Sequence, residues 1–324
     1  MNTKKSREKI MTKRAHALAV VLGGGAGFAI ALQGLLSFAM PTAAQTNLDI
    51  TTQEEIRSAK TTNPFENISL EARAVYVFDL KTNAVLYAKN ENEKIPLASI
   101  TKIMTALVAR EHLPESSVIT ITKDDISAEG DSGLRTGERW RLGDILNLMM
   151  IISSNDAARA VAEFTGREGR MEQSVDTMPS RGRFIQMMNE KALALGLDQM
   201  EFFNESGLDV SVTQNGGYGS ARNVAELFAE LWKKYPENVE ITARKDARIY
   251  SQDDIAHILP NTNEIVGRIP GLVASKTGFT NISGGNLAVI FDRGIGDTVV
   301  AVVLGSTYKG RFDDMQKLVE AVRK

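Results

Sequence analysis

The hydrophobic pattern divides the chain into strand-like segments near both ends and helical segments between them. Residues 72–80 and 84–90 are rich in β-branched and aromatic residues and are joined by a three-residue turn, which predicts a β-hairpin. Two further strands are expected at residues 285–293 and 297–306, separated by a glycine-containing turn. The helical spacing of apolar positions predicts helices over residues 143–151, 155–164, 184–196, 220–235 and 312–323.

This order of elements favours an α+β fold. An antiparallel sheet built from both chain ends would be flanked by helices and would carry an inserted helical subdomain. We place the folded domain at residues 68–324 and the helical subdomain at about residues 105–265. A crevice between the sheet and the inserted helices is the expected ligand site. Residues 167–183 are polar and poorly patterned, which predicts an exposed loop.

The N-terminal part has the composition of an export segment. A basic tail over residues 1–14 precedes residues 15–44, which are almost free of formal charge and end in small residues suited to a signal peptidase. The apolar stretch is also long enough to span a bilayer as a helix of about 20 residues, so cleavage and retention as a membrane anchor both stay open. With a polar linker at residues 45–67, either outcome predicts an extracytoplasmic catalytic part in the cell envelope.

Composition disfavours several classes of function. The 324 residues carry a formal net charge of −2, so no overall basic field indicates nucleic acid as a partner. The absence of cysteine excludes thiol catalysis and thiolate metal sites. The three histidines, His16, His112 and His257, lack the spacing of metal ligands, so we expect neither a metal nor another cofactor.

The candidate chemistry begins at Ser99 and Lys102, a Ser-x-x-Lys pair at the head of a helical apolar segment. The pattern alone is weak, because the chain contains it three times. Here, however, both residues lie off the apolar stripe, and a hydroxyl at a helix N-terminus lies near positive backbone dipoles. A partly buried lysine loses its proton more easily and can then act as a base. The alternative is a helix cap beside a solvated lysine.

Two later motifs favour catalysis. Ser153 and Asn155 form a Ser-x-Asn element between two predicted helices, and Lys276–Gly278 is a Lys-Thr-Gly element that opens the C-terminal strand region. Taken singly, the first fits a helix cap and the second a plain turn. Each occurs once, however, and with Ser-x-x-Lys they stand in the order found in penicillin-binding proteins and class A β-lactamases.

At these motifs the chain resembles the D-alanyl-D-alanine carboxypeptidases, which are low-molecular-mass penicillin-binding proteins. The resemblance extends from about residue 72 to residue 323 and includes "ASITKIMTALVA", "FFNESGLD" and "SKTGFTNISGGNLA" in the same order. It implies a serine peptidase that removes the terminal D-alanine of peptidoglycan stem peptides through an acyl-enzyme. It also implies covalent inhibition by β-lactams and the fold with a helical insert.

The resemblance implies a chemical role for the first two motifs. Ser99 is the expected nucleophile, Lys102 is its base, and Ser153 relays a proton to the leaving D-alanine. Asn155 is expected to hold both the substrate amide and Lys102.

The third motif is expected to bind the substrate. Lys276 and Thr277 would attract and hold the terminal carboxylate. Gly278 would let the substrate lie against the strand with no Cβ in the way. The backbone N–H groups of Ser99 and Phe279 would form the oxyanion hole.

The chain also departs from its apparent relatives. Some of them carry an arginine inside an Asn-x-Asn element before the third motif, where this chain has Thr262. Carboxylate binding would then rest on Lys276 and Thr277, with Arg222 as a candidate third group. Residues 167–183 resemble an insertion.

Three alternative functions stay open. A D,D-endopeptidase that cuts peptidoglycan cross-links would use the same three motifs. A class A β-lactamase needs a glutamate for deacylation, and the expected Glu-x-x-x-Asn spacing is absent between Ser153 and Lys276. A catalytically inactive wall-binding protein is disfavoured because all three motifs are intact.

Overall fold

The computed structural model describes residues 63–127, 129–130, 132–168, 178–294 and 296–324 of the chain. The predicted basic tail, signal or anchor segment and most of the predicted linker lie outside these residues. The helices within these ranges are α2 (Lys102–His112), α3 (Leu142–Ile151), α4 (Asn155–Glu168), α5 (Ser180–Ala194), α6 (Ala221–Lys234) and α7 (Gly310–Val322). The strands are β1 (Ala74–Asp79), β2 (Val85–Lys89), β3 (Ile95–Pro96), β4 (Val118–Thr120), β5 (Arg139–Arg141), β6 (Glu201–Phe202), β7 (Gly217–Gly219), β8 (Asp246–Tyr250), β9 (Ala256–Pro260), β10 (Leu272–Thr280), β11 (Gly284–Gly294) and β12 (Asp297–Ser306).

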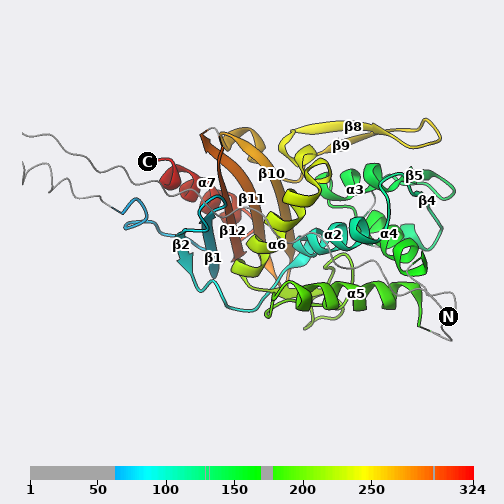
Figure 1. Ribbon diagram of the computed structural model, residues 1–324, viewed down its shortest axis with the longest axis horizontal. Helices are drawn as coiled ribbons and strands as arrows, with labels where there is room; N and C mark the ends of the chain where they lie inside the picture. Colours follow the sequence, from blue (N-terminus) through cyan, green and yellow to red (C-terminus); the bar gives the residue numbers. More distant parts are fainter. Residues whose placement is uncertain (1–62, 128, 131, 169–177, 295) are drawn as a thin grey trace, which may run out of the picture. The chain divides into compact units, whose positions relative to one another are not determined.

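The main sheet combines strands from both ends of the folded domain. Its order is β10-β11-β12-β1-β2, and every neighbouring pair is antiparallel. β1 pairs with β12 from Ala74 opposite Leu304 to Asp79 opposite Val299, and Figure 1 shows the early strands beside the late ones. The predicted α+β fold is therefore confirmed. β10 is a terminal strand of this sheet, so one of its edges faces away from β11.

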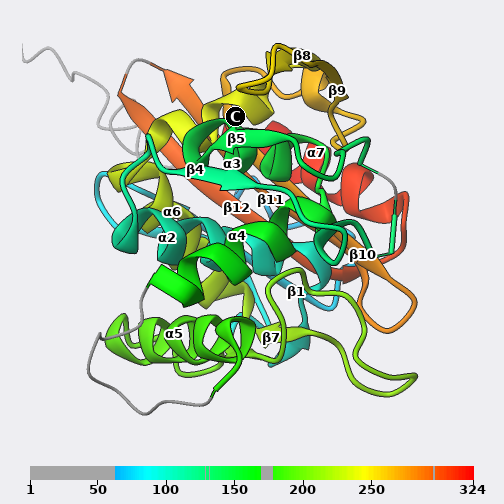
Figure 2. The same cartoon turned by 90° about the vertical axis from the view of Figure 1, so that its right-hand side faces the viewer.

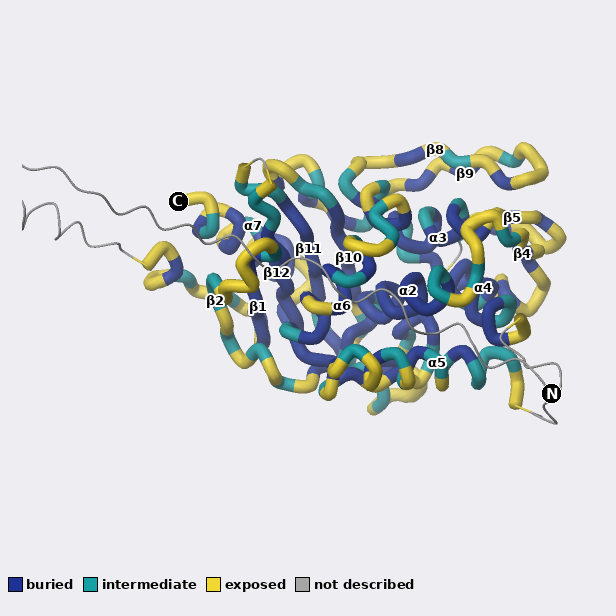
Figure 3. The backbone as a smooth tube through the Cα atoms, in the orientation of Figure 1, coloured by how far each residue is buried: buried dark blue, intermediate teal, exposed yellow. Residues whose placement is uncertain are grey.

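The two faces of the sheet pack against different helices. Successive residues of a strand point to opposite faces. In β1, Val75 and Val77 belong to a hydrophobic cluster with α7, whereas Tyr76 and Phe78 belong to the larger cluster that includes residues of α2 to α6. Figure 3 shows the middle of the sheet and α2 as almost wholly buried. The sheet therefore forms a rigid wall beside the helices that carry the first two motifs.

Helix α2 occupies the centre of the helical region. Every residue from Lys102 to Ala109 is buried, and the helix packs against α3, α4, α5 and α6. Figure 2 shows α2, α4 and α5 in front of the sheet. The start of α6 follows the sequence expectation, because the Ser220 hydroxyl caps the helix and accepts the backbone N–H of Asn223 at 3.2 Å.

Several local features differ from the sequence expectations. The pairs β4–β5 and β8–β9 are additional, and their strands are only three to five residues long. The Lys-Thr-Gly element lies in the second half of β10, not at its start. The predicted loop over residues 167–183 is wrong at both ends, because α4 continues to Glu168 and α5 begins at Ser180, directly after Pro179.

The residues that the structure describes belong to one compact unit. The boundaries of the helical subdomain, about residues 105–265, stay a prediction. Among the residues that the structure describes, no helix combines the length and the apolarity needed to cross a membrane.

Candidate active site

Ser99 lies in a tight turn that leads directly into α2. It belongs to a 3₁₀ helix, Ala98–Thr101, and not to the α-helix itself. Ala98 has a positive φ of 48°, a conformation that costs a non-glycine residue about 1–2 kcal/mol. Asn215 holds the turn, since its Oδ1 accepts the backbone N–H of Ala98 at 3.2 Å. The turn places Ser99 on the wall of a cleft.

Lys102 is the fully buried partner of Ser99. Its Nζ donates to Ser99 Oγ at 2.9 Å, to Asn155 Oδ1 at 2.7 Å and to the backbone oxygen of Ser206 at 2.8 Å. Burial lowers the pKa of Lys102 from 10.5 to about 7, against the opposing effect of the negative charge on Glu205. A substantial fraction of Lys102 is therefore neutral near pH 7 and able to accept a proton.

Ser153 and Asn155 lie on the turn between α3 and α4. Ser153 adopts a φ of 62°, which is unusual for a residue with a side chain. Between them, Ser154 caps α4, because its Oγ accepts the backbone N–H of Ala157 at 3.0 Å. Besides its contact with Lys102, Asn155 donates one Nδ2–H to the backbone oxygen of Glu129 at 2.7 Å. The amide has a second N–H with which to bind a ligand.

Lys276 reaches from β10 to the opposite wall of the site. Its Nζ donates to Ser153 Oγ at 2.8 Å and to the backbone oxygen of Thr277 at 2.9 Å. The side chain is buried, with 1% of the residue exposed. Burial lowers the pKa of Lys276 well below its ordinary value, and repulsion by Lys102 and Arg311 adds to the effect. The structure thus joins the second and third motifs by a hydrogen bond.

A cleft of about 310 Å³ brings these motifs together. Thr262 and Thr277 meet on its wall, with their Oγ1 atoms 2.6 Å apart, so Thr262 orients the hydroxyl that is predicted to bind a carboxylate. The cleft is lined by Ser99, Ser153, Asn261, Thr262, Glu264, Thr277, Gly278, Phe279, Tyr308 and Arg311. The lining is mainly polar, with Arg311 as its cation and with Glu264 bonded to the hydroxyl of Tyr308 at 3.0 Å.

Gly278 has a packing role besides the predicted one toward a substrate, which stays a prediction. A Cβ at this position would lie 2.7 Å from the backbone oxygen of Leu97 and 3.2 Å from the backbone nitrogen of Ser99. Real Cβ atoms essentially never approach within 3.0 Å. The glycine is therefore required because β10 packs directly against the Ser99 turn, and the nearest obstacle to a side chain is the protein itself.

The edge of β10 away from β11 is partly occupied by the protein itself. The backbone N–H of Ser275 leaves the sheet and binds Thr242 Oγ1 at 2.8 Å. Backbone groups of a strand alternate in direction, so the N–H of Phe279, four residues later, points to the same side. A Cβ on Gly278 would lie 3.2 Å from the Ser99 nitrogen, so β10 and the Ser99 turn are close at this point. The oxyanion hole of the Ser99 and Phe279 N–H groups stays a prediction.

Arg222, the predicted third carboxylate ligand, lies elsewhere. It forms an ion pair with Glu91 at 3.2 Å and stacks on the ring of Tyr76, and it does not line the cleft. This expectation is wrong, because Arg222 lies at the start of α6, which packs on β12, β1 and β11, and its side chain is held by Glu91 and Tyr76.

Arg311 supplies the cation that sequence reasoning missed. This largely buried residue of α7 donates from Nη1 to the backbone oxygen of Gly278 at 2.8 Å and lies over the rings of Tyr308 and Phe312. It lines the cleft. Burial lowers the pKa of Arg311, but a guanidinium stays charged at all ordinary pH values. No motif signals this residue.

Glu205 is a second residue near Lys102 that the sequence motifs do not indicate. Its buried carboxylate binds Nη2 of Arg181 with both oxygens, at 2.8 and 3.1 Å. The hydroxyl of Thr105, one turn after Lys102, donates to the Glu205 backbone oxygen at 2.6 Å. Glu205 therefore fixes the segment that supplies the Ser206 carbonyl to Lys102, and its charge acts on the lysine.

The described ranges contain no group of three or more His, Cys, Asp or Glu side chains placed to hold a metal ion. The arrangement offers instead a serine hydroxyl, a buried amine beside it, a second hydroxyl bonded to a second lysine, and a permanent cation. Such a set is suited to acyl transfer through a covalent intermediate.

Sequence comparison gives an independent view of the chain. A profile of the S11 peptidases, described as D-alanyl-D-alanine carboxypeptidase, matches residues 58–307. Over 256 residues the chain is 31% identical to the D-alanyl-D-alanine carboxypeptidase DacF of Bacillus subtilis. The matched region covers 77% of this chain and 61% of DacF. It is 29% identical to a D-alanyl-D-alanine endopeptidase of Escherichia coli, over 79% of this chain and 74% of that protein. The chain thus spans about three fifths of the length of DacF.

Comparison with solved structures agrees on the fold. Penicillin-binding protein D2 of Listeria monocytogenes, solved in its ampicillin-bound form, superposes with a TM-score of 0.65. The two chains are 28% identical, and the match covers 80% of this chain and all of the other.

Proposed function

Because this chain belongs to the D-alanyl-D-alanine carboxypeptidase family, we propose that it hydrolyses the terminal D-alanyl-D-alanine bond of peptidoglycan stem peptides. The observation that carries the proposal is the 2.9 Å hydrogen bond between Ser99 Oγ and Nζ of the fully buried Lys102. A neutral amine at this position is a base for the serine hydroxyl. Under the same proposal, the residues that bind the substrate are Asn155, Lys276, Thr277, Gly278 and Phe279.

The cleft suits the end of such a substrate. The terminal carboxylate would bind the hydroxyl of Thr277 in the positive potential of Lys276 and Arg311. Since the pKa of Lys276 is lowered well below its ordinary value, Arg311 is the more dependable charge. The remaining N–H of Asn155 would hold the preceding amide. The substrate backbone would lie along the edge of β10 away from β11.

Acylation would begin with attack by Ser99 Oγ on the carbonyl carbon of the penultimate D-alanine, while the hydroxyl proton passes to Lys102 Nζ. The N–H groups of Ser99 and Phe279 would stabilise the oxyanion. The C–N bond then breaks as Ser153 gives its hydroxyl proton to the leaving nitrogen and takes the proton held by Lys102, so that both residues return to their starting states. The products of this step are free D-alanine and an ester on Ser99.

Deacylation completes the cycle. Water attacks the ester carbonyl, the bond to Ser99 Oγ breaks, and the serine regains its proton. The shortened stem peptide leaves as a carboxylate. A β-lactam presents a similar amide, so it would acylate Ser99 and leave slowly. Because stem peptides lie outside the cytoplasm, we place the enzyme in the cell envelope, with the N-terminal segment as its export signal or anchor.

The test is intact-protein mass spectrometry after incubation with penicillin, combined with an assay for D-alanine release from a pentapeptide. We expect a stable adduct on the wild type, none on Ser99→Ala, and D-alanine release by the wild type alone. Penicillin hydrolysis without an adduct would indicate a β-lactamase instead. Intact penicillin with no adduct would indicate an inactive wall-binding protein. Endopeptidase activity is the second candidate, favoured by the resemblance to the Escherichia coli enzyme.

A further inference from the structure

Helix α5 holds the segment that supplies one of the acceptors of Lys102. This segment runs from Phe202, at the end of β6, to Ser206, whose backbone oxygen accepts from Lys102 Nζ at 2.8 Å. We call residues 202–206 the support segment. At its first residue, the side chain of Asn189 on α5 donates to the Phe202 backbone oxygen and accepts the Phe202 N–H, both at 2.9 Å. Two hydrogen bonds therefore fix one end of the segment to α5.

Arg181, in the first turn of α5, holds the other end of the support segment. Its Nη2 lies 2.8 and 3.1 Å from the two carboxylate oxygens of Glu205, the residue directly before Ser206. The Glu205 side chain is 3% exposed and that of Arg181 is 33% exposed, so the arginine reaches the buried carboxylate from the surface. The Glu205 backbone oxygen is bound to α2, because it accepts from the hydroxyl of Thr105 at 2.6 Å. Glu205 thus connects α5 with the helix that carries Lys102.

The charge of Glu205 makes its partner important. A carboxylate buried near a lysine stabilises the protonated amine unless another cation compensates it. The charge of Glu205 opposes the effect of burial on the pKa of Lys102, whereas Lys102 and Lys276 of β10 repel each other. Arg181 is the cation bound directly to Glu205. It therefore limits the effect of the carboxylate on the lysine.

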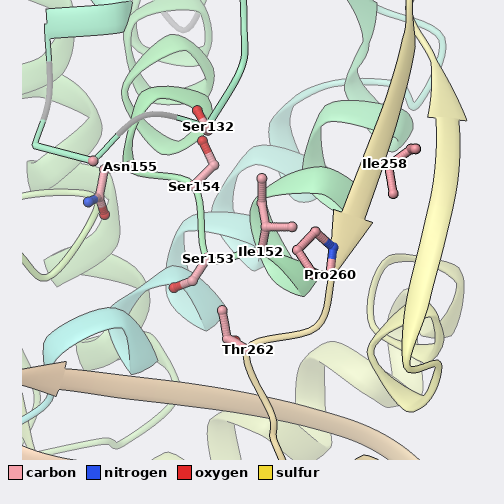
Figure 4. Close-up of a pocket in the computed structure, with 9 residues that line it drawn as sticks. Ser132, Ile152, Ser153, Ser154, Asn155, Ile258, Pro260 and Thr262 are labelled. Atoms are coloured by element: carbon pink, nitrogen blue, oxygen red, sulfur yellow. The ribbon is translucent and has the colours of Figure 1, made fainter.

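The other two acceptors of Lys102 are neutral and come from different segments. Ser99 Oγ lies in the preceding turn, and Asn155 Oδ1 lies at the start of α4. Figure 4 shows Asn155 and Ser153 on the segment that enters α4, where both line a cavity of about 430 Å³. Since none of these residues belongs to α5 or to the support segment, a change at Arg181 removes no group of the cleft.

We infer that Arg181 is a positioning residue for acylation, because it binds the Glu205 carboxylate in place of Lys102 and keeps the Ser206 carbonyl on the lysine. The inference rests on the proposed function, since it assumes that Lys102 is the base for Ser99. Arg181 would act only through Glu205 and the support segment. Helix α5 would thereby help to set the base, although none of its described residues lines the cleft.

The test is the rate of acylation by penicillin between pH 5 and 10 for the wild type, Arg181→Met and Arg181→Lys. Without the arginine, the charge of Glu205 stabilises protonated Lys102, so the midpoint for Arg181→Met should rise by about one pH unit. Arg181→Lys keeps the charge, and a single nitrogen makes both contacts, so its midpoint should stay within about 0.3 unit of the wild type. A purely structural role would lower the plateau rate and the thermal stability without moving the midpoint.

Two further variants show whether the effect is specific. Arg183→Met is the matched control, because Arg183 lies two residues later in α5 and donates to the backbone oxygens of Gly166 at 2.6 Å and Met178 at 3.0 Å. Its midpoint should equal that of the wild type.

The double variant Arg181→Met with Glu205→Gln should have the midpoint of Glu205→Gln alone, since the arginine acts through the carboxylate. This variant leaves no unpaired buried charge, so it can be measured even if Arg181→Met does not fold.

The outcomes separate the two proposals. An unchanged midpoint in Arg181→Met, with the penicillin adduct still formed, overturns this inference and leaves the proposed function standing. A shift of equal size in Arg183→Met, or an effect of Arg181→Met that persists without the Glu205 carboxylate, also overturns it. Absence of the adduct on the wild type overturns the proposed function and this inference with it.

Discussion

The backbone of Gly278 lies against the backbone of Ser99, with room for a hydrogen but not for a methyl group. An added Cβ would lie 2.7 Å from the carbonyl oxygen of Leu97 and 3.2 Å from the nitrogen of Ser99. The third motif is thus packed on the first. The placement of the nucleophile depends on this contact.

Gly278→Ala should therefore displace the Ser99 turn. We expect overpacking to lower the free energy of unfolding by about 1–3 kcal/mol and the rate of acylation by penicillin at least about tenfold. Gly267→Ala is the control, because a Cβ there meets nothing within 4 Å. Urea denaturation and stopped-flow acylation measure the two effects. Normal acylation by Gly278→Ala would show that the close packing is not needed.

Ser99→Ala should abolish acylation with little effect on the fold. The hydroxyl accepts one hydrogen bond from Lys102, and the lysine keeps its bonds to Asn155 and to the Ser206 carbonyl. The expected loss in unfolding free energy is about 1 kcal/mol. Thermal denaturation and the penicillin adduct are the measurements. A variant that still forms the adduct would mean that another residue is the nucleophile.

Two substitutions of Ser153 distinguish the catalytic role of its hydroxyl from the strain in its backbone. Ser153→Ala and Ser153→Gly both remove the hydroxyl that accepts from Lys276, so both should lower acylation by about a hundredfold or more. The two variants differ in the cost of the backbone conformation, since glycine adopts the observed φ of 62° freely and alanine does not. We expect Ser153→Gly to be more stable than Ser153→Ala by about 1 kcal/mol. Equal stabilities in urea would show that the turn relaxes in the alanine variant.

The pH dependence of acylation should report Lys102. Only the neutral amine can accept the Ser99 proton, and its pKa of about 7 means that protonation increases below that pH. The rate should therefore level off above pH 7 and fall about tenfold per unit at lower pH, to about a hundredth of the plateau at pH 5. Acylation rates between pH 5 and 9 measure this. A flat profile would exclude Lys102 as the base.

Glu205→Gln should shift that profile. The negative charge of Glu205 raises the pKa of Lys102 against the effect of burial, so its removal should lower the pKa and move the midpoint to more acidic pH. Glu111→Gln is the matched control, because Glu111 pairs with Lys191 and Lys234 on the protein surface. A midpoint that stays the same or rises in Glu205→Gln would contradict the coupling.

The sequence predicts the architecture well, because long amphipathic and alternating segments determine most of it. The Ser220 cap follows from a local pattern, and the pairing of early with late strands follows from the order of strands and helices along the chain. The short hairpin β8–β9 does not, since both strands are only five residues long and β8 carries Asp246 and Arg248. Its Ile258 nevertheless lines a cavity beside Ser153.

The sequence predicts the motif residues of the candidate site but not the residues that hold them in place. Ser-x-x-Lys shows that a serine and a lysine are one turn apart, but not that the lysine is completely buried. The contributions of Arg311 and Glu205 depend on packing between segments far apart in the chain, which no spacing reveals. Arg222 was misplaced for the same reason, since its partner Glu91 lies on a distant segment.

The pairing of β1 with β12 also has a consequence for the order in which the protein is made. A ribosome completes β1 and β2 early, but β1 cannot gain its second neighbour until β12 is synthesised, after the whole helical region. Long-range pairing of this kind is slow, and in the meantime an apolar strand has an unpaired edge. The growing chain should therefore need protection from self-association until its last strands are available.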